Sequence, residues 1–167
     1  MQGKRIAVIV TVICAVAFAI WSSWPGEERR IRSRLEDLAA TATERGGPGL
    51  GQMAHAAKLA GFFTADAVVD LGPPYPEIRG RETIMALAAK SMVPGDDFAV
   101  AFEDVAVTLG PGATSATARL TAVVSGQGPR LLNDTFDARE LEIDLLKPAG
   151  EWQLHRVTII EAIQRPR

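Results

Sequence analysis

The stretch FFTADAVVDLGPPYPEIRGRETI, residues 62–84, carries several structural signals in close succession. Its two phenylalanines end an expected helix over 50–63, and the short apolar run over 67–71 is typical of a strand. The prolines that follow predict a corner, because proline continues neither a helix nor a central strand. Gly80 then opens another expected helix over 82–92. This order predicts an α+β arrangement in which the phenylalanines pack helices against a sheet.

The chain before this stretch is predicted to be helical, and the chain after it is predicted to be sheet. Ile31, Leu35 and Leu38 recur at helical spacing. The apolar pattern of a later strand changes sides at Glu103–Asp104, which predicts a β-bulge. Alternating polar and apolar residues predict antiparallel strands over 98–109, 114–125, 135–147 and 152–163.

Two finer expectations concern contacts within this arrangement. A hairpin centred on Ala149 would place Lys147 opposite Glu151, and Glu142 opposite Arg156. Alanines at 86–89 and 116–122 predict a close contact of the third helix with the sheet. Such a contact suits a filled interior better than a roomy one.

The first residues have the pattern of a membrane anchor. Residues 6–24 carry no charge and as a helix would be about 28 Å long, close to the ~30 Å hydrocarbon core. Trp21 and Trp24 suit the interface between lipid and water. We expect residues 1–25 to be a retained transmembrane anchor and residues 26–167 to be the folded domain. The alternative is a cleaved signal peptide with a small-residue site at Ala17–Phe18–Ala19.

The anchor implies a location and a set of contacts. We expect a single-pass protein of a bacterial inner membrane, with its soluble domain in the periplasm. The basic residues just past the span suit contact with anionic lipid or with a partner subunit, although a solvated helix face explains them too. These candidate contact residues are Trp21, Trp24, Arg29, Arg30, Arg32 and Arg34.

Composition argues against several classes of function. The net charge of −2 comes from interspersed acids and bases, so no basic stripe indicates nucleic-acid binding. One cysteine and two histidines do not make a zinc site, and we expect no metal and no cofactor. The glycines of GGPGLG, residues 46–51, follow a helix and lack phosphate-loop spacing.

Three stretches resemble the nuclear transport factor 2-like superfamily, which includes ketosteroid isomerase and small polyketide cyclases. They are FFTADAVVDLG as a helix end and first strand, EIRGRETIMALA as a third helix opened by glycine, and GEWQLHRVTII as the last strand. The resemblance implies an α+β cone of three helices packed on a curved antiparallel sheet, and it allows a homodimer formed through the open sheet face.

The enzymes of this superfamily place an acid or a base inside the cone. The candidates here are His155 with Asp144 on an adjacent strand, and His55 on the second helix. A solvated acidic face at Asp144, a half-exposed strand position for His155 and a boundary position for His55 explain the same residues without catalysis. Ketosteroid isomerases also use a tyrosine, but Tyr75 lies in the proline corner, which departs from that pattern.

Two functions follow from these observations. The first is a non-catalytic accessory or scaffold subunit of a larger membrane complex (photosynthetic, respiratory, secretion or transport), with the soluble domain docked on other membrane-protein subunits. The alternative is an anchored isomerase- or cyclase-like enzyme, or a carrier of a small ligand, that uses the cone pocket.

Overall fold

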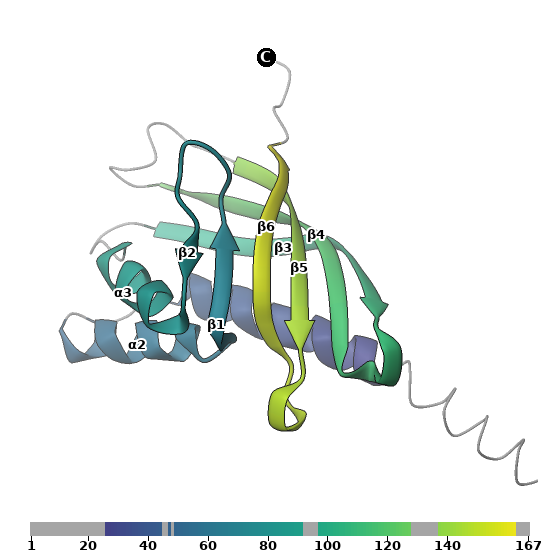
Figure 1. The fold of residues 1–167 in the computed structure, drawn as a ribbon. Coiled ribbons are helices and arrows are strands. Elements are labelled where there is room, and N and C mark those ends of the chain that lie inside the picture. The colour runs from purple at the N-terminus through teal and green to yellow at the C-terminus, as the bar shows by residue number, and fades with distance from the viewer. Residues whose placement is uncertain (1–25, 45–46, 48, 92–96, 128–136, 163–167) are drawn as a thin grey trace, which may run out of the picture.

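The domain combines helices with one curved six-stranded sheet (Figure 1). The structure is a computed structural model that describes residues 26–44, 47, 49–91, 97–127 and 137–162. Its helices are a long helix over 26–43, α2 (Leu50–Ala60) and α3 (Arg81–Ser91). Its strands are β1 (Phe63–Asp70), β2 (Ile78–Arg79), β3 (Asp97–Leu109), β4 (Ser115–Gln127), β5 (Asp137–Leu146) and β6 (Gln153–Ala162). The α+β cone expected from the sequence is confirmed.

The strands follow the order β2-β1-β6-β5-β4-β3. The expectation of a wholly antiparallel sheet is wrong at one pair, because β1 runs parallel to β6. A tight hairpin enforces antiparallel pairing between consecutive strands. β1 and β6 are separated by most of the domain, so their relative direction is set by how the β3–β6 meander packs on the helices.

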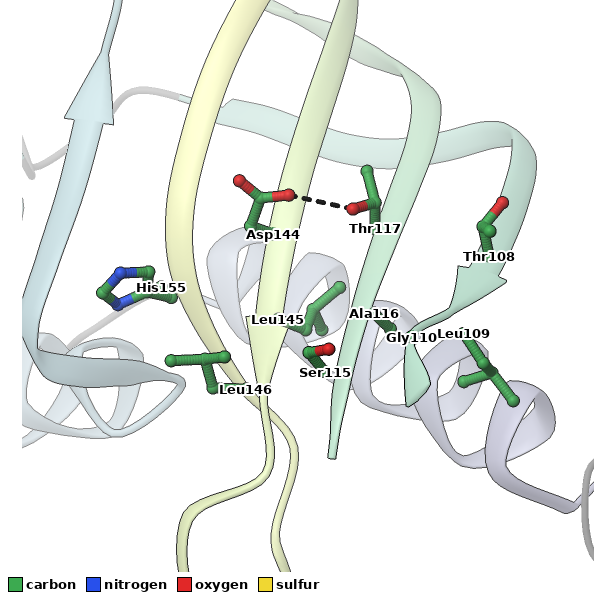
Figure 2. Close-up of a pocket in the computed structure, with 10 residues that line it drawn as sticks. All are labelled: Thr108, Leu109, Gly110, Ser115, Ala116, Thr117, Asp144, Leu145, Leu146 and His155. Atoms are coloured by element: carbon green, nitrogen blue, oxygen red, sulfur yellow. Dashed lines mark hydrogen bonds between the residues drawn. The ribbon is translucent and has the colours of Figure 1, made fainter. Parts of the chain in front are cut away.

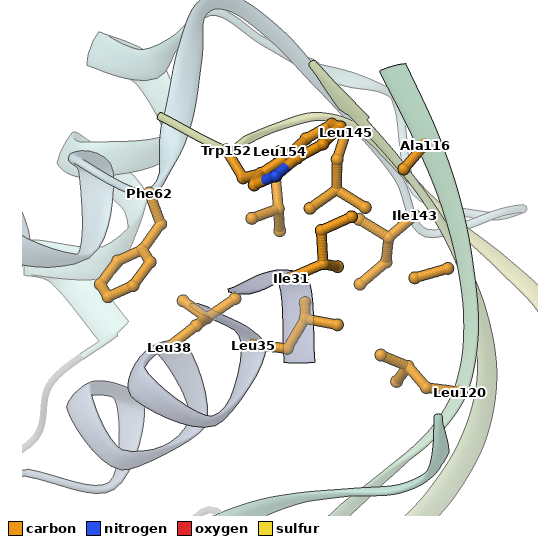
Figure 3. Packing of buried hydrophobic residues seen from close by; sticks show 11 residues of the cluster. Ile31, Leu35, Leu38, Phe62, Ala116, Leu120, Ile143, Leu145, Trp152 and Leu154 are labelled. Carbon is orange, nitrogen blue, oxygen red and sulfur yellow. The ribbon is translucent and has the colours of Figure 1, made fainter. Parts of the chain in front are cut away.

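The long helix lies across the concave face of the sheet, and the core forms between them (Figure 3). The expected stripe is confirmed: Ile31 and Leu35 are almost fully buried, and Leu38 is buried beside them. Trp152 closes one end of this layer and Phe62 borders it from the start of β1. The sheet contributes Ala116, Ala118, Leu120, Ile143, Leu145 and Leu154. Among the described residues, this part of the cone is therefore filled with side chains.

The expected bulge in β3 is confirmed. The pairing of β3 with β4 shifts between Glu103 and Ala106, and Asp104 has a φ of 52°. A bulge leaves an extra residue out of the ladder and bends the strand, which curves the sheet around the long helix.

The predicted register of the last hairpin is wrong by two residues. Glu142 lies opposite Thr158, and Arg156 lies opposite Asp144. The turn between the strands is longer than expected. The pairing of β5 with β6 also shifts by one residue, since Leu145 pairs with Leu154 while Asp144 pairs with Arg156. His155 is thus the additional residue of a bulge in β6. Lys147 forms its ion pair with the long helix and not with Glu151.

The second helix is shorter than predicted, and β1 is longer. α2 ends at Ala60, where the Gly61 N–H bonds to the Ala57 carbonyl at 3.0 Å. The chain then turns at once, and the Leu154 amide donates to the Phe62 carbonyl at 2.9 Å. Phe62 therefore lies in the turn and Phe63 begins the strand, because pairing with β6 outweighs the helical pattern.

Gly80 opens α3 as expected. Its φ is +86°, a conformation that favours glycine. Its amide donates to the Ala67 carbonyl of β1 at 2.8 Å, and its carbonyl accepts from the Ile84 amide. α3 then packs on α2, β1 and β2. The expected contact between the alanines of α3 and those of β4 is wrong, since the long helix occupies that position.

The predicted anchor, with Trp21 and Trp24, lies outside the described residues. Among the helices that the structure describes, none has both the length and the apolar character needed to cross a membrane.

Candidate functional site on the outer sheet face

The outer face of the sheet, which points away from the long helix, carries two of the titratable candidates, Asp144 and His155. Alternation along each strand produces this arrangement, since the buried residues Ile143 and Leu145 flank Asp144. Asp144 lies opposite Thr117 on β4 and opposite Arg156 on β6. The sequence prediction placed His155 and Asp144 on adjacent strands, which the structure shows, but they lie outside the packed layer of the cone.

A pocket of about 380 Å³ borders this face (Figure 2). The Thr117 hydroxyl donates to Asp144 Oδ1 at 3.0 Å, so the carboxylate has a partner within the sheet. Leu146, 37% exposed, adds an apolar side chain at the edge. The polar lining consists of Thr108, Ser115, Thr117, Asp144 and His155.

His155 is held from β1, by residues that the sequence analysis did not identify. Its Nδ1 lies 3.2 Å from Thr64 Oγ1 and 3.6 Å from Asp66 Oδ1. Thr64 is buried, whereas the Asp66 side chain is 78% exposed and the imidazole 33%. The bulge in β6 and the irregular pairing of β1 between Phe63 and Val68 create this contact. Neither irregularity has a simple sequence signal, although a polar Thr–Ala–Asp segment in an apolar strand does mark the place.

These three groups form a chain of hydrogen-bond partners. The Thr64 hydroxyl is the main cause of a lowered pKa at Asp66, and the Asp66 backbone amide and His155 lower that pKa further against the opposing effect of desolvation. Because the Thr64 hydroxyl donates to Asp66, its oxygen can accept a hydrogen bond from His155 Nδ1–H. The second ring nitrogen, Nε2, is then the atom that could exchange a proton with a ligand.

The other two candidates lie elsewhere. His55 is buried on α2, and its position contributes to the lowered pKa of Glu44, for which the main cause is Lys58. Tyr75 is 62% exposed in the proline corner, where its amide donates to the Gly72 carbonyl. Neither is among the lining residues of the pocket that His155 and Asp144 share.

Two of the four arginines of the long helix are tied to the domain itself. Arg32 donates to the Val105 carbonyl at the bulge of β3. The Arg34 guanidinium lies 4.2 Å from the Phe62 ring centroid and also reaches the Gly61 carbonyl. Arg30 forms an exposed ion pair with Glu27 at 2.7 Å, and Arg29 is exposed. Lipid or partner contact thus remains a prediction best suited to Arg29 and Arg30.

Exposed apolar side chains occur on both helices of the α2–α3 pair. The helices are joined by a hydrogen bond from the Gln52 amide group to the Ala89 carbonyl. Of the seven large apolar side chains that are exposed in the described structure, four lie on this pair. We call them the α2–α3 surface: Leu50, Met53, Met85 and Leu87.

The described residues include no group of three or more His, Cys, Asp or Glu side chains that could hold a metal ion.

The model of the SnoaL-like domain matches residues 50–158, which is well over half of the chain. The chain therefore belongs to the SnoaL-like domain family, in agreement with the resemblance drawn from the sequence. A comparison with curated protein sequences finds no match.

Solved structures show the same fold. ActVI-ORFA from Streptomyces coelicolor superposes with a TM-score of 0.64 at 17% identity, covering 82% of this chain and 97% of the other. A nuclear transport factor 2-like protein with a cystatin-like fold from Novosphingobium aromaticivorans gives 0.64 at 18% identity, with coverages of 85% and 86%. A proposed scytalone dehydratase from the same organism gives 0.65 at 14% identity, with coverages of 86% and 88%.

Proposed function

We propose that this chain is a membrane-anchored accessory subunit whose SnoaL-like domain binds partner proteins through the α2–α3 surface. The observation that carries this proposal is the concentration of exposed leucine and methionine side chains on one helix pair. Large apolar side chains that are exposed on both helices of one pair are candidates for burial by a partner, and methionine adapts well to varied apolar surfaces. The position of the titratable candidates adds support, because His155 and Asp144 lie outside the filled layer of the cone.

Residues 6–24 supply the anchor in this proposal, and the domain is placed in the periplasm. The partners are other subunits of an inner-membrane complex, and a homodimer through the open sheet face is compatible with this proposal.

The test is extraction of native membranes in mild detergent, followed by sizing and mass spectrometry of the co-migrating proteins. We expect the chain to migrate in a larger complex and Met53→Lys to release it. Ile160→Lys is the matched control, since Ile160 is 49% exposed on β6 and lies outside the α2–α3 surface. Migration of the unmodified chain alone, or equal behaviour of the two variants, would contradict the proposal.

A second candidate function rests on the contact of His155 with Thr64 and Asp66 beside the pocket. In this alternative the chain is an anchored enzyme, with His155 as the acid or base and Asp144 orienting a small substrate. The fold neighbours include a proposed scytalone dehydratase, so dehydration or isomerisation is the reaction class to assay. Loss of turnover in a folded His155→Ala variant would favour this candidate over the accessory role.

A further inference from the structure

The beginning of the long helix is fastened to the turn between β5 and β6. Glu27 Oε2 accepts hydrogen bonds from Lys147 Nζ at 2.7 Å and from Trp152 Nε1 at 2.8 Å. The Glu27 and Lys147 side chains are only 14% and 17% exposed, so this ion pair is well shielded from solvent. The first helical turn therefore has a fixed position relative to the last hairpin.

The turn between β3 and β4 joins the same end of the molecule. The Lys147 amide donates to the Thr114 carbonyl at 2.9 Å, which links the two turns. In Figure 1 both turns lie toward the end of the sheet at which the long helix begins. We call this region the tethered end and define it as residues 26–30, 110–114 and 147–151.

We propose that the tethered end lies on the lipid surface and fixes the orientation of the domain on the membrane. This inference rests on the membrane anchor of the proposed function. If the span ends at Trp24, it lies two positions before Gly26, the first described residue of the long helix, and two residues reach at most about 7 Å. A connection that short holds the first helical turn at the headgroups, and the bonds of Glu27 then bring both turns with it.

The chemistry of the tethered end suits a headgroup layer without anionic lipid. The exposed residues of both turns, at 111–114 and 148–150, are proline, glycine, alanine and threonine, with no charge to keep them in bulk water. The surrounding charges balance, since Arg29, Arg30 and Lys147 match the three glutamates at positions 27, 28 and 151. The short connection to the membrane anchor, and not electrostatic attraction, then holds the tethered end against the lipid.

The orientation has a consequence for the partner. The long helix is about 27 Å long at ~1.5 Å per residue, and the α2–α3 pair lies at its far end (Figure 1). The α2–α3 surface is therefore held away from the bilayer, within reach of the soluble part of a membrane complex.

The experiment measures the distance of labelled sites from the lipid in the full chain. The protein is placed in phosphatidylcholine vesicles that contain a small fraction of lipid with a quencher on its headgroup. Cys14→Ser removes the native thiol, and a fluorophore is attached at Ala149→Cys or Thr114→Cys in the two turns. Ala57→Cys, exposed on α2, is the matched control.

We expect quenching at positions 149 and 114 to be several-fold stronger than at 57, and unchanged when phosphatidylglycerol is added. In the Glu27→Ala background, quenching at 149 should fall toward the value at 57 while the protein still floats with the vesicles. Equal quenching at all three sites in floating protein would overturn the orientation alone. Failure to float would instead overturn the anchor of the proposed function.

Discussion

Thr43 on the long helix and Val100 on the edge strand β3 are bonded to each other although 57 residues separate them. The Thr43 hydroxyl oxygen accepts a hydrogen bond from the Val100 amide at 3.0 Å and donates to the Ala39 carbonyl at 2.9 Å. Arg32, near the other end of the same helix, bonds to the Val105 carbonyl. The helix thus occupies backbone groups of an edge strand, which would otherwise be open to pairing with another chain.

Thr43→Val should remove the bond to Val100 and keep the shape of the side chain. We expect the free energy of unfolding to fall by about 1 kcal/mol, the usual net value of one hydrogen bond, in urea denaturation. Thr83→Val, on the exposed side of α3, is the control. A loss of the same size in both variants would show that helix propensity, and not the edge-strand bond, is responsible.

Leu145→Ala should be among the most destabilising substitutions on β5. Its side chain is fully buried, so truncation leaves a cavity, and a loss of about 2–5 kcal/mol is expected. Leu146→Ala, one residue along and partly exposed on the outer face, should cost far less. Denaturant unfolding of both variants measures the difference. Equal losses would contradict the placement of Leu145 on the buried face and Leu146 on the outer face of the sheet.

Gly80→Ala should destabilise the domain by forcing an alanine into left-handed backbone, at a cost of about 1–2 kcal/mol. Gly51→Ala is the opposite case, because Gly51 lies within α2 with open space around it and alanine should stabilise by about 0.5–1 kcal/mol. Thermal unfolding of the pair should therefore show shifts of opposite sign.

Glu27→Gln should make stability less dependent on pH. The hydrogen bond from Lys147 is the main reason that the pKa of Glu27 lies below its usual value of 4.5, with further lowering by Trp152 and Arg30. A lowered pKa in the folded state stabilises the protein above pH 4.5, and this contribution is lost as the pH falls toward the folded-state value.

The difference in unfolding free energy between the native protein and Glu27→Gln should thus be largest near neutral pH and shrink below pH 4.5. Glu151→Gln, an exposed change in the adjacent turn, is the control. A difference that stays constant from pH 7 to pH 3 would show that Glu27 acts through packing and not through its charge.

His155→Ala should leave assembly unchanged if the domain is an accessory subunit. The partly exposed imidazole contacts Thr64 and Asp66 on the outer face of the sheet, so only a small loss of stability is expected. Native sizing and denaturant unfolding of the same preparation separate the two effects. A folded variant that leaves the complex would assign His155 to the interface.

The sequence alone determined the types and order of the elements. Periodic leucine and isoleucine positions defined the long helix, alternation defined β3–β6, and the parity change at Glu103–Asp104 located the bulge. These features depend on each residue and its near neighbours, which the sequence records directly.

Only the tertiary structure decided how distant segments meet. The parallel pairing of β1 with β6, the two-residue shift of the last hairpin, the contact of His155 with Thr64 and Asp66, and the bond of Glu27 to Trp152 all join residues from different elements. The direction of two non-consecutive strands and the place of a bulge depend on the total packing of helices against the sheet. No local pattern records that sum, and so the same sequence that predicted the cone could not predict which residues of distant elements meet.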